Sequence, residues 1–225
     1  MTRATIRFAA ILAGVALAGV FAWNAATHWH PSIKTYPLQG IDLDEAPGPI
    51  EWGSVRANGA DFAYLVATAG ADRRDPGFEA NWSALPDAGL RRGAVHLYSL
   101  CQPAIAQANA FNAFVPRDDD PLPVAIDLSF RDDCAARPER RTLIAELHTL
   151  IAAIETHTGK PVLLRITRPV EAAYQLSAAI DRPVWAIAPA VSPTYAARPW
   201  RMWRASSIRR LDGIDGPVNW DVVAP

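Results

Sequence analysis

Short apolar runs alternate with amphipathic segments from about residue 38 to the C-terminus. The apolar runs have the length of strands, and they predict strands at residues 40–43, 62–68, 93–99, 123–128, 161–166, 183–187 and 200–205. Helical candidates lie between them at residues 50–58, 78–88, 104–114, 140–158 and 169–179, with the clearest three- and four-residue spacing of leucine and isoleucine in 140–158. Such alternation favours a mainly parallel sheet, here an α/β barrel of five strand–helix units followed by strands with little helix between them.

The first 26 residues have the pattern of an export signal or a membrane anchor. Arg3 and Arg7 precede an unbroken apolar run at residues 8–23, an order that keeps the N-terminus on the cytoplasmic side and sends the rest of the chain across the membrane. Trp23 and Trp29 are typical of the interfacial aromatic residues of a retained helix, whereas the small residues near the end of the run permit cleavage. Both outcomes stay open. The predicted location is extracytoplasmic, on the periplasmic side, with the protein either anchored in the inner membrane or secreted.

Composition supports one folded domain behind this segment. Residues 27–37 are polar and contain prolines, so they predict a short linker, and residues 38–225 form the domain. Half of the residues are hydrophobic, which is enough to bury a core. The 22 basic residues nearly balance the 23 acidic ones without a basic stripe, so nucleic acid is not an expected partner. We expect a monomer without a metal or cofactor.

Cys101 and Cys134 are the two cysteines of the chain. In an oxidising compartment an even pair usually closes a disulfide, which here would join the loops that follow two consecutive strands. Two buried free thiols are the alternative. A metal site is disfavoured, because no neighbouring histidine or cysteine supplies the other ligands.

Residues at the C-terminal ends of barrel strands line the active face of such a fold. On the predicted strands, this rule selects carboxylate, polar and aromatic side chains: Asp42, Asp44, Thr68, His96, Tyr98, Asp127, Arg165, Trp185 and Trp203. Carboxylates and aromatic rings are the groups that oxocarbenium-ion chemistry and sugar stacking require.

Several short motifs occur in an order that is specific as a set. They lie at residues 39–42 (Gln-Gly-Ile-Asp), 50–52, 61–64, 67–68, 75–78, 81–82, 88–96, 184–185 and 213–218. In this order the chain resembles the family 25 glycoside hydrolases, the Chalaropsis-type lysozymes. The resemblance implies a modified TIM-like barrel of five strand–helix units plus three strands. It also implies peptidoglycan as partner and cleavage of the bond between N-acetylmuramic acid and N-acetylglucosamine.

The resemblance breaks at the catalytic motif. Family members carry Asp-any-Glu at the end of the fourth strand, with the Glu as general acid, where this chain has Asp127-Leu128-Ser129. A serine hydroxyl cannot protonate a departing sugar oxygen as a carboxylic acid of raised pKa can. Asp42 and Asp127 are retained as catalytic candidates. Further departures from the family pattern are Asn219 for an Asp, Arg165 for a Tyr, Arg204 for a Gln and Ala69 for a Glu.

Substrate contacts are expected from Tyr64, His96, Tyr98, Arg165, Trp185, Trp203 and Arg204. Structural roles remain open for several of the candidates. Asp42 could cap a turn, Asp127 could be a buried structural acid, and His96 could be a hydrogen-bonded core histidine. Trp185 and Trp203 fit a core as well as a groove.

The sequence leaves three functions open. In the favoured one the protein binds peptidoglycan at the membrane with weak or no hydrolysis, and its new arginines hold the carboxylates of muropeptides. In the second it is an active muramidase with a substitute acid. Asp44 is the best candidate, because it lies two residues after Asp42 on the same strand face, and Glu45 and Asp132 are weaker ones. A purely structural or protein-binding domain is the third.

Overall fold

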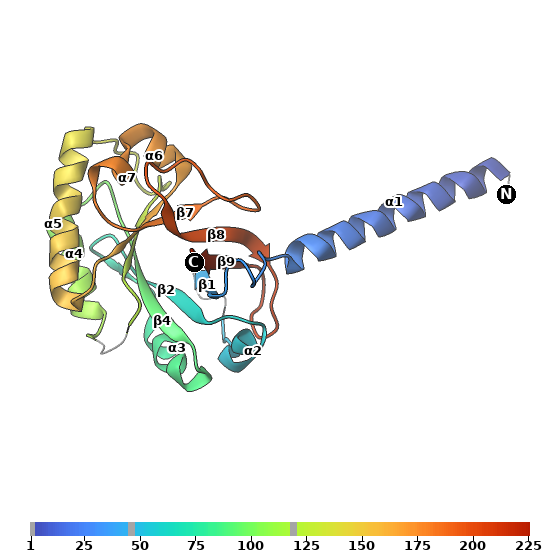
Figure 1. Ribbon diagram of the computed structural model, residues 1–225, viewed down its shortest axis with the longest axis horizontal. Coiled ribbons are helices and arrows are strands. Elements are labelled where there is room, and N and C mark those ends of the chain that lie inside the picture. Colours follow the sequence, from blue (N-terminus) through green and yellow to red (C-terminus); the bar gives the residue numbers. More distant parts are fainter. Residues whose placement is uncertain (1–2, 45–47, 118–120) are drawn as a thin grey trace.

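The computed structural model describes residues 3–44, 48–117 and 121–225 of the chain. A long N-terminal helix, α1 (Arg3–His28), projects from a barrel that contains the other elements (Figure 1). Glu45, one of the weaker acid candidates, lies outside the described residues.

The described residues form one sheet of nine strands in the order β1-β9-β8-β7-β6-β5-β4-β2-β3, and a further pairing of β1 with β2 closes the barrel. Neighbouring strands among β1, β2 and β4 through β8 are parallel, whereas β9 runs antiparallel to both β8 and β1, and β3 runs antiparallel to β2. The short β3 pairs only with β2. The strands are β1 (Gln39–Leu43), β2 (Phe62–Ala69), β3 (Arg73–Arg74), β4 (Arg91–Leu97), β5 (Ala125–Leu128), β6 (Leu163–Ile166), β7 (Val184–Ile187), β8 (Trp200–Arg209) and β9 (Val218–Val223).

Helices follow each of the first five barrel strands. They are α2 (Trp52–Ala57), α3 (Phe78–Ala84) with the 3₁₀ turn η1 (Pro86–Ala88), α4 (Ala104–Phe114), α5 (Arg140–Thr158), and α6 (Arg168–Tyr174) with α7 (Leu176–Ala179). The strands β7, β8 and β9 then close the barrel with no helix described between them. The predicted α/β barrel of five strand–helix units and three strands is confirmed.

Two local predictions need correction. The single helix expected at 169–179 is broken at Gln175, whose φ of 47° lies in the left-handed region. Side chains satisfy the backbone groups that the break leaves without helical partners. Arg140 Nε donates to the carbonyl of Tyr174 over 2.6 Å, and Glu171 Oε2 accepts from the N–H of Ser177 over 3.1 Å. The sequence pattern also missed β9, a strand in which buried polar residues alternate with apolar ones.

Two apolar layers enclose the strands. The predicted stripe of α5 is buried against the sheet: Leu143, Leu147, Leu150, Ile151 and Ile154. The inside of the barrel holds a second cluster with aromatic side chains, including Tyr64 and Trp185, whose rings lie 5.0 Å apart. Polar side chains above this cluster are therefore enclosed by apolar walls, where their mutual interactions strengthen.

The segment at residues 27–37 lies against the barrel. Gln39 Nε2 donates to the carbonyls of Pro31 and Tyr36 over 2.9 and 2.8 Å, and the Tyr36 ring lies 6.0 Å from that of Trp203. At the end of α1, the backbone N–H of Arg210 donates to the carbonyl of Thr27 over 2.8 Å. The C-terminal end of α1 is thus held against the segment that directly follows β8.

A disulfide links Cys101 to Cys134, as the sequence predicts. It joins the loop after β4 to the loop after β5. Both loops follow C-terminal ends of strands, so the bond lies beside the face that carries the site.

Candidate functional site

Three aspartates and two arginines meet where the parallel strands end. Asp42 and Asp127 come from β1 and β5, Asp44 directly follows β1, and Arg165 and Arg204 come from β6 and β8. The pairing registers bring them together, since Asp127 lies opposite Arg165 in the ladder between β5 and β6. The predicted catalytic aspartates thus share one cluster with the predicted arginines.

Arg165 is the centre of this cluster. Its Nε donates to Asp127 Oδ2 over 2.6 Å, its Nη1 to Asp42 Oδ2 over 2.8 Å, and its Nη2 to Asp44 Oδ1 over 3.3 Å. The side chain is 2% exposed, and its guanidinium lies 5.1 Å from the ring centroid of Trp185. One buried cation therefore connects the carboxylates from two sides of the barrel.

Arg204 and Asn219 complete the hydrogen bonding of the first strand's carboxylates. Arg204 Nε donates to Asp42 Oδ1 over 3.0 Å, and its Nη2 contacts Asp42 Oδ2 and Asp44 Oδ1. Asn219 Nδ2 donates to Asp42 Oδ2 over 3.2 Å and to Asp44 Oδ2 over 3.0 Å. Both oxygens of the fully buried Asp42 are thereby occupied by protein donors.

Ser129 lies where the resemblance places the family's general acid. Its hydroxyl donates to Asp127 Oδ1 over 2.5 Å, while Asp127 Oδ2 accepts from Arg165. Asp127 thus has a donor on each oxygen, and Ser129 acts as a donor to a carboxylate.

Asp44 differs from its neighbours because its side chain is 56% exposed. Partial burial raises the pKa of this carboxyl, but Arg204, Arg165 and Asn219 outweigh that effect and hold the pKa below its ordinary value. At neutral pH Asp44 is therefore ionised, which is the wrong state for a general acid.

Asp221, a fully buried residue of β9, was not among the residues predicted from the sequence. Its Oδ1 accepts from Trp185 Nε1 over 2.8 Å, and its buried Oδ2 has no hydrogen-bond partner among the described residues. Burial, followed by the nearby charge of Asp42, raises the pKa of Asp221 well above 3.8. The two-residue spacing from Asn219 could have revealed it, because alternate strand residues share a face.

His96 is buried among groups that satisfy both ring nitrogens. Gln107 Oε1 lies 3.2 Å from Nε2, and because this oxygen can only accept, Nε2 carries the proton. Nδ1 then accepts from the hydroxyl of Thr68 over 2.8 Å. Burial lowers the pKa of His96 to about 4, so the ring is neutral. These contacts place His96 in the packed layer between the sheet and α4, on the opposite side of the sheet from the barrel interior.

The predicted aromatic contacts are also buried. Tyr64 donates its hydroxyl to the carbonyl of Pro123 over 2.9 Å, and Trp203 Nε1 donates to the carbonyl of Ala188 over 2.8 Å. Tyr98 and Trp185 are 4% and 0% exposed. The structure thus gathers Asp42, Asp127, Arg165 and Arg204 at one point, and it places these aromatic rings within the packed interior.

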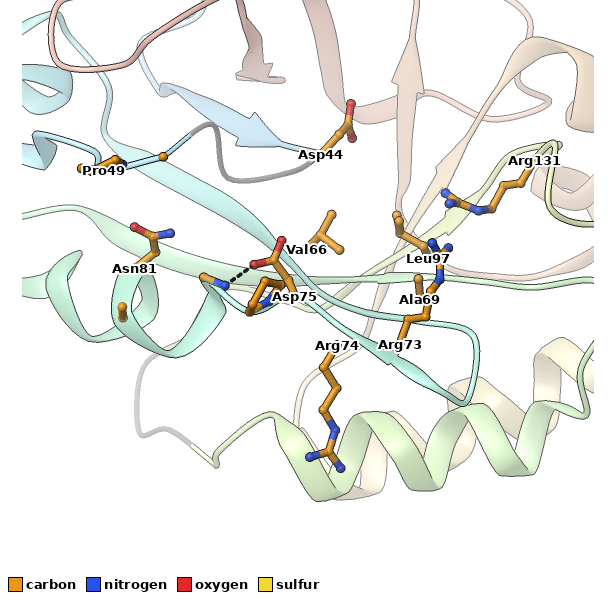
Figure 2. Close-up of a pocket in the computed structure, with 14 residues that line it drawn as sticks. Asp44, Pro49, Val66, Ala69, Arg73, Arg74, Asp75, Asn81, Leu97 and Arg131 are labelled. Atoms are coloured by element: carbon orange, nitrogen blue, oxygen red, sulfur yellow. Dashed lines mark hydrogen bonds between the residues drawn. The ribbon is translucent and has the colours of Figure 1, made fainter.

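An open groove begins beside this cluster. It has a volume of about 600 Å³, and Asp44 lies at one side with Arg73 and Arg131 at the other (Figure 2). Arg73 Nη2 and Arg131 Nε contact the two oxygens of Asp133 at 2.9 and 3.4 Å. Among the described residues, no group of three or more His, Cys, Asp or Glu side chains could hold a metal ion.

These features define the class of the protein. It is a β/α barrel with acidic side chains at the C-terminal ends of its strands and a groove beside them, an arrangement suited to carbohydrate chemistry.

Comparison with known proteins specifies the family. Residues 41–214 match the model of the glycosyl hydrolases family 25. Lysozyme M1 of Streptomyces globisporus is 30% identical over 203 residues, which cover 82% of this chain and 67% of that protein. The uncharacterized protein YegX of Escherichia coli K12 is 29% identical over 199 residues, covering 84% and 70% of the two chains.

Solved structures agree with the sequence comparison. A family 25 glycosyl hydrolase from Bacillus anthracis superimposes with a TM-score of 0.79 at 27% identity, covering 87% of this chain and 92% of that one. A bacterial lysozyme from Streptomyces coelicolor gives a TM-score of 0.76 at 28% identity, covering 83% and 91%. The chain belongs to glycosyl hydrolase family 25.

Proposed function

We propose that this protein binds peptidoglycan glycan strands at the outer face of the inner membrane and hydrolyses them weakly or not at all. The observation that carries the proposal is the identity of the residue at the position where the family has its catalytic acid. Ser129 stands there, and its hydroxyl is a hydrogen-bond donor to Asp127.

Hydrolysis of a glycosidic bond requires one carboxyl group that delivers a proton and a second group that stabilises or attacks the sugar. Here Arg165 and Ser129 occupy the oxygens of Asp127, and Arg165, Arg204 and Asn219 occupy those of Asp42. A sugar entering the groove would meet acids that already have protein partners. Positioned acid catalysis contributes about 10²- to 10⁴-fold, so its loss lowers the rate by a comparable factor.

Binding needs no acid, and the groove provides surface for it. Arg165 and Arg204 are paired with the aspartates, so they are not available for muropeptide carboxylates. Arginines that line the groove would make these contacts instead. Arg73 is 56% exposed and Arg131 is 27% exposed, and a single carboxylate, Asp133, is shared between them. Guanidinium groups of this kind can pair with the carboxylates of a peptide stem.

The family's action on peptidoglycan implies an extracytoplasmic location, which agrees with the N-terminal segment. In α1 the window Ile11–His28 has a mean hydropathy of 1.4 and is long enough to cross a membrane, by length and composition only. We take α1 as a retained anchor that holds the barrel close to the membrane.

An active muramidase is the second candidate, because Asp44 is exposed at the side of the groove next to Asp42. In that mechanism Asp44 would deliver the proton. Its lowered pKa disfavours this role, since an ionised carboxylate has no proton to give. Asp132 is exposed as well, but it does not line this groove.

Full-length protein incubated with purified peptidoglycan tests both candidates at once. Co-sedimentation measures binding, and chromatography of released muropeptides measures hydrolysis. We expect sedimentation with release at or below about 1% of a family lysozyme assayed in parallel, from the acid's contribution alone. An Arg73→Gln, Arg131→Gln double variant should sediment less, with the exposed Arg201→Gln as matched control. Release at lysozyme level that Asp44→Asn abolishes would establish the active muramidase instead.

A further inference from the structure

Arg209, the last residue of β8, is a buried cation that has no counter-ion among the described residues. The residue is 7% exposed, and its guanidinium lies 3.7 Å from the ring centroid of Trp220. Its Nε and Nη1 atoms are buried and have no hydrogen-bond partner among the described residues. Arg165 and Arg204, the other buried arginines described above, each contact aspartates.

The ring contact explains only part of this arrangement. A cation over an indole face is stabilised by the ring, but the ring face leaves the N–H donors of the guanidinium plane unused. Buried donors without acceptors are costly, and a buried charge is normally paired. Burial lowers the pKa of Arg209 to about 10, and no carboxylate among the described residues offsets this effect. The site therefore suits an anion from outside the chain.

The position of Arg209 indicates where that anion comes from. The N–H of the next residue, Arg210, donates to the carbonyl of Thr27 in the last turn of α1. At 1.5 Å per residue the 18-residue apolar window of α1 is about 27 Å long, close to the ~30 Å of a hydrocarbon core. If α1 spans the bilayer, its last turn lies at the boundary where lipid phosphates are found.

The surroundings of Arg209 fit the same boundary. Trp29, in the segment that follows α1, is 40% exposed, and Ile208, which precedes Arg209, is 43% exposed. The ring of His30 lies 6.0 Å from that of Trp220. Exposed apolar and aromatic side chains beside a cation are typical of a surface at the level of lipid headgroups.

We propose that Arg209 binds the phosphate of an anionic phospholipid headgroup at the C-terminal end of α1 and so docks this end of the barrel on the membrane. The proposal rests on the retention of α1 as an anchor. Docking would fix the barrel's orientation relative to the membrane, in addition to tethering it.

Full-length protein in nanodiscs tests this inference. One set contains phosphatidylcholine alone, and the other contains one third phosphatidylglycerol at the same ionic strength. The phosphate of phosphatidylcholine is paired with its own ammonium group, so it competes poorly for a guanidinium. Thermal unfolding of the barrel is followed by near-UV circular dichroism. Wild type, Arg209→Gln and Arg201→Gln are compared, the last being an exposed arginine at the other end of β8.

We expect phosphatidylglycerol to raise the wild-type midpoint by about 3 to 6 °C, the shift that a bound ligand gives a domain of this size. Arg201→Gln should keep this difference, and Arg209→Gln should lose it. If Arg209→Gln does not fold, Arg209→Lys should keep less than half of it, because lysine lacks the bidentate fork. Equal midpoints in both lipids, or a difference that persists in Arg209→Gln, would overturn the proposal.

Two further measurements distinguish a lipid site from a free-phosphate site and test the anchor separately from the docking. Inorganic phosphate added to the phosphatidylcholine discs should leave the midpoint unchanged, and an equal rise with free phosphate would contradict a lipid site. Flotation with vesicles of either composition reports on the anchor. Flotation without a midpoint difference would refute only the role of Arg209, whereas failure to float would refute the anchor and the docking together.

Discussion

Arg165 Nε donates to Asp127 Oδ2 over 2.6 Å, which places a permanent cation on a buried aspartate at the C-terminal end of β5. The same guanidinium reaches Asp42 on the opposite side of the barrel mouth. The two aspartates are thus physically connected, because one guanidinium pairs with both of them. A change at one of these positions is expected to depend on the others.

Restoring the acid should restore little activity by itself. A Ser129→Glu carboxylate would lie near Arg165, which would keep its pKa low and the group ionised. We expect less than a 10-fold gain in muropeptide release from Ser129→Glu, and a larger gain when Arg165→Tyr is added. The upper limit is about 10²- to 10⁴-fold, the value of a positioned acid. Equal gains with and without Arg165→Tyr would show that the arginine does not suppress the acid.

Arg165 should also be essential for stability. The Arg165→Met change leaves Asp42 and Asp127 buried without their shared partner, and breaking a buried pair in this way costs about 3 to 5 kcal/mol. Urea unfolding of the two proteins measures the difference. Arg73→Met, at an exposed arginine, is the control and should change the free energy of unfolding by less than about 0.5 kcal/mol.

Asp221 should make stability fall as pH rises. Its folded-state pKa is raised above 3.8, so above that pH the unfolded chain releases a proton that the folded chain retains. The stability contribution is complete below about pH 3.8 and is lost as the pH rises through the folded-state pKa. Asp221→Asn keeps the acceptor for Trp185, so it should remove this loss and be as stable as wild type, or more stable, at pH 7.

The pH profile of unfolding, measured by denaturant titration between pH 4 and 8, checks this expectation. Asp221→Ala serves as a comparison, because it removes the acceptor and should destabilise at every pH. A steeper fall with pH in Asp221→Asn than in wild type would contradict the assignment of a protonated carboxyl.

The disulfide between Cys101 and Cys134 encloses a loop with a sequence separation of 33 residues. In the loop-entropy model a loop of this length contributes about 3.5 to 4 kcal/mol to stability. The double change to serine should lower the free energy of unfolding by roughly this amount. Reductant should reproduce the loss in wild type and have no effect on the double variant.

Retention of α1 predicts full-length protein in the inner membrane after cell fractionation. Alkaline carbonate should not extract it, because a spanning helix is held by its apolar length and not by charge. Recovery of a soluble form that begins near Trp23 would instead establish that the segment is a cleaved signal.

The sequence by itself determined the elements whose apolar periodicity is strong. The α5 stripe, the parallel strands and the disulfide pair follow from local pattern and spacing, since these depend on residues close in sequence or on the export context. The break at Gln175 did not, because it depends on Arg140, a side chain 35 residues away that satisfies backbone groups at the break.

The composition of the site was readable from the sequence, but its chemistry was decided by tertiary structure. The sequence supplied Asp42, Asp127 and Arg165 as candidates at strand ends, with no information on whether the arginine faces a ligand or the acids. Closure of the barrel brings residues 123 positions apart to within 2.8 Å, and burial makes their pairing the favourable outcome. The same closure buries Asp221 beside Asp42 and raises its pKa, an effect that exists only when the strands meet.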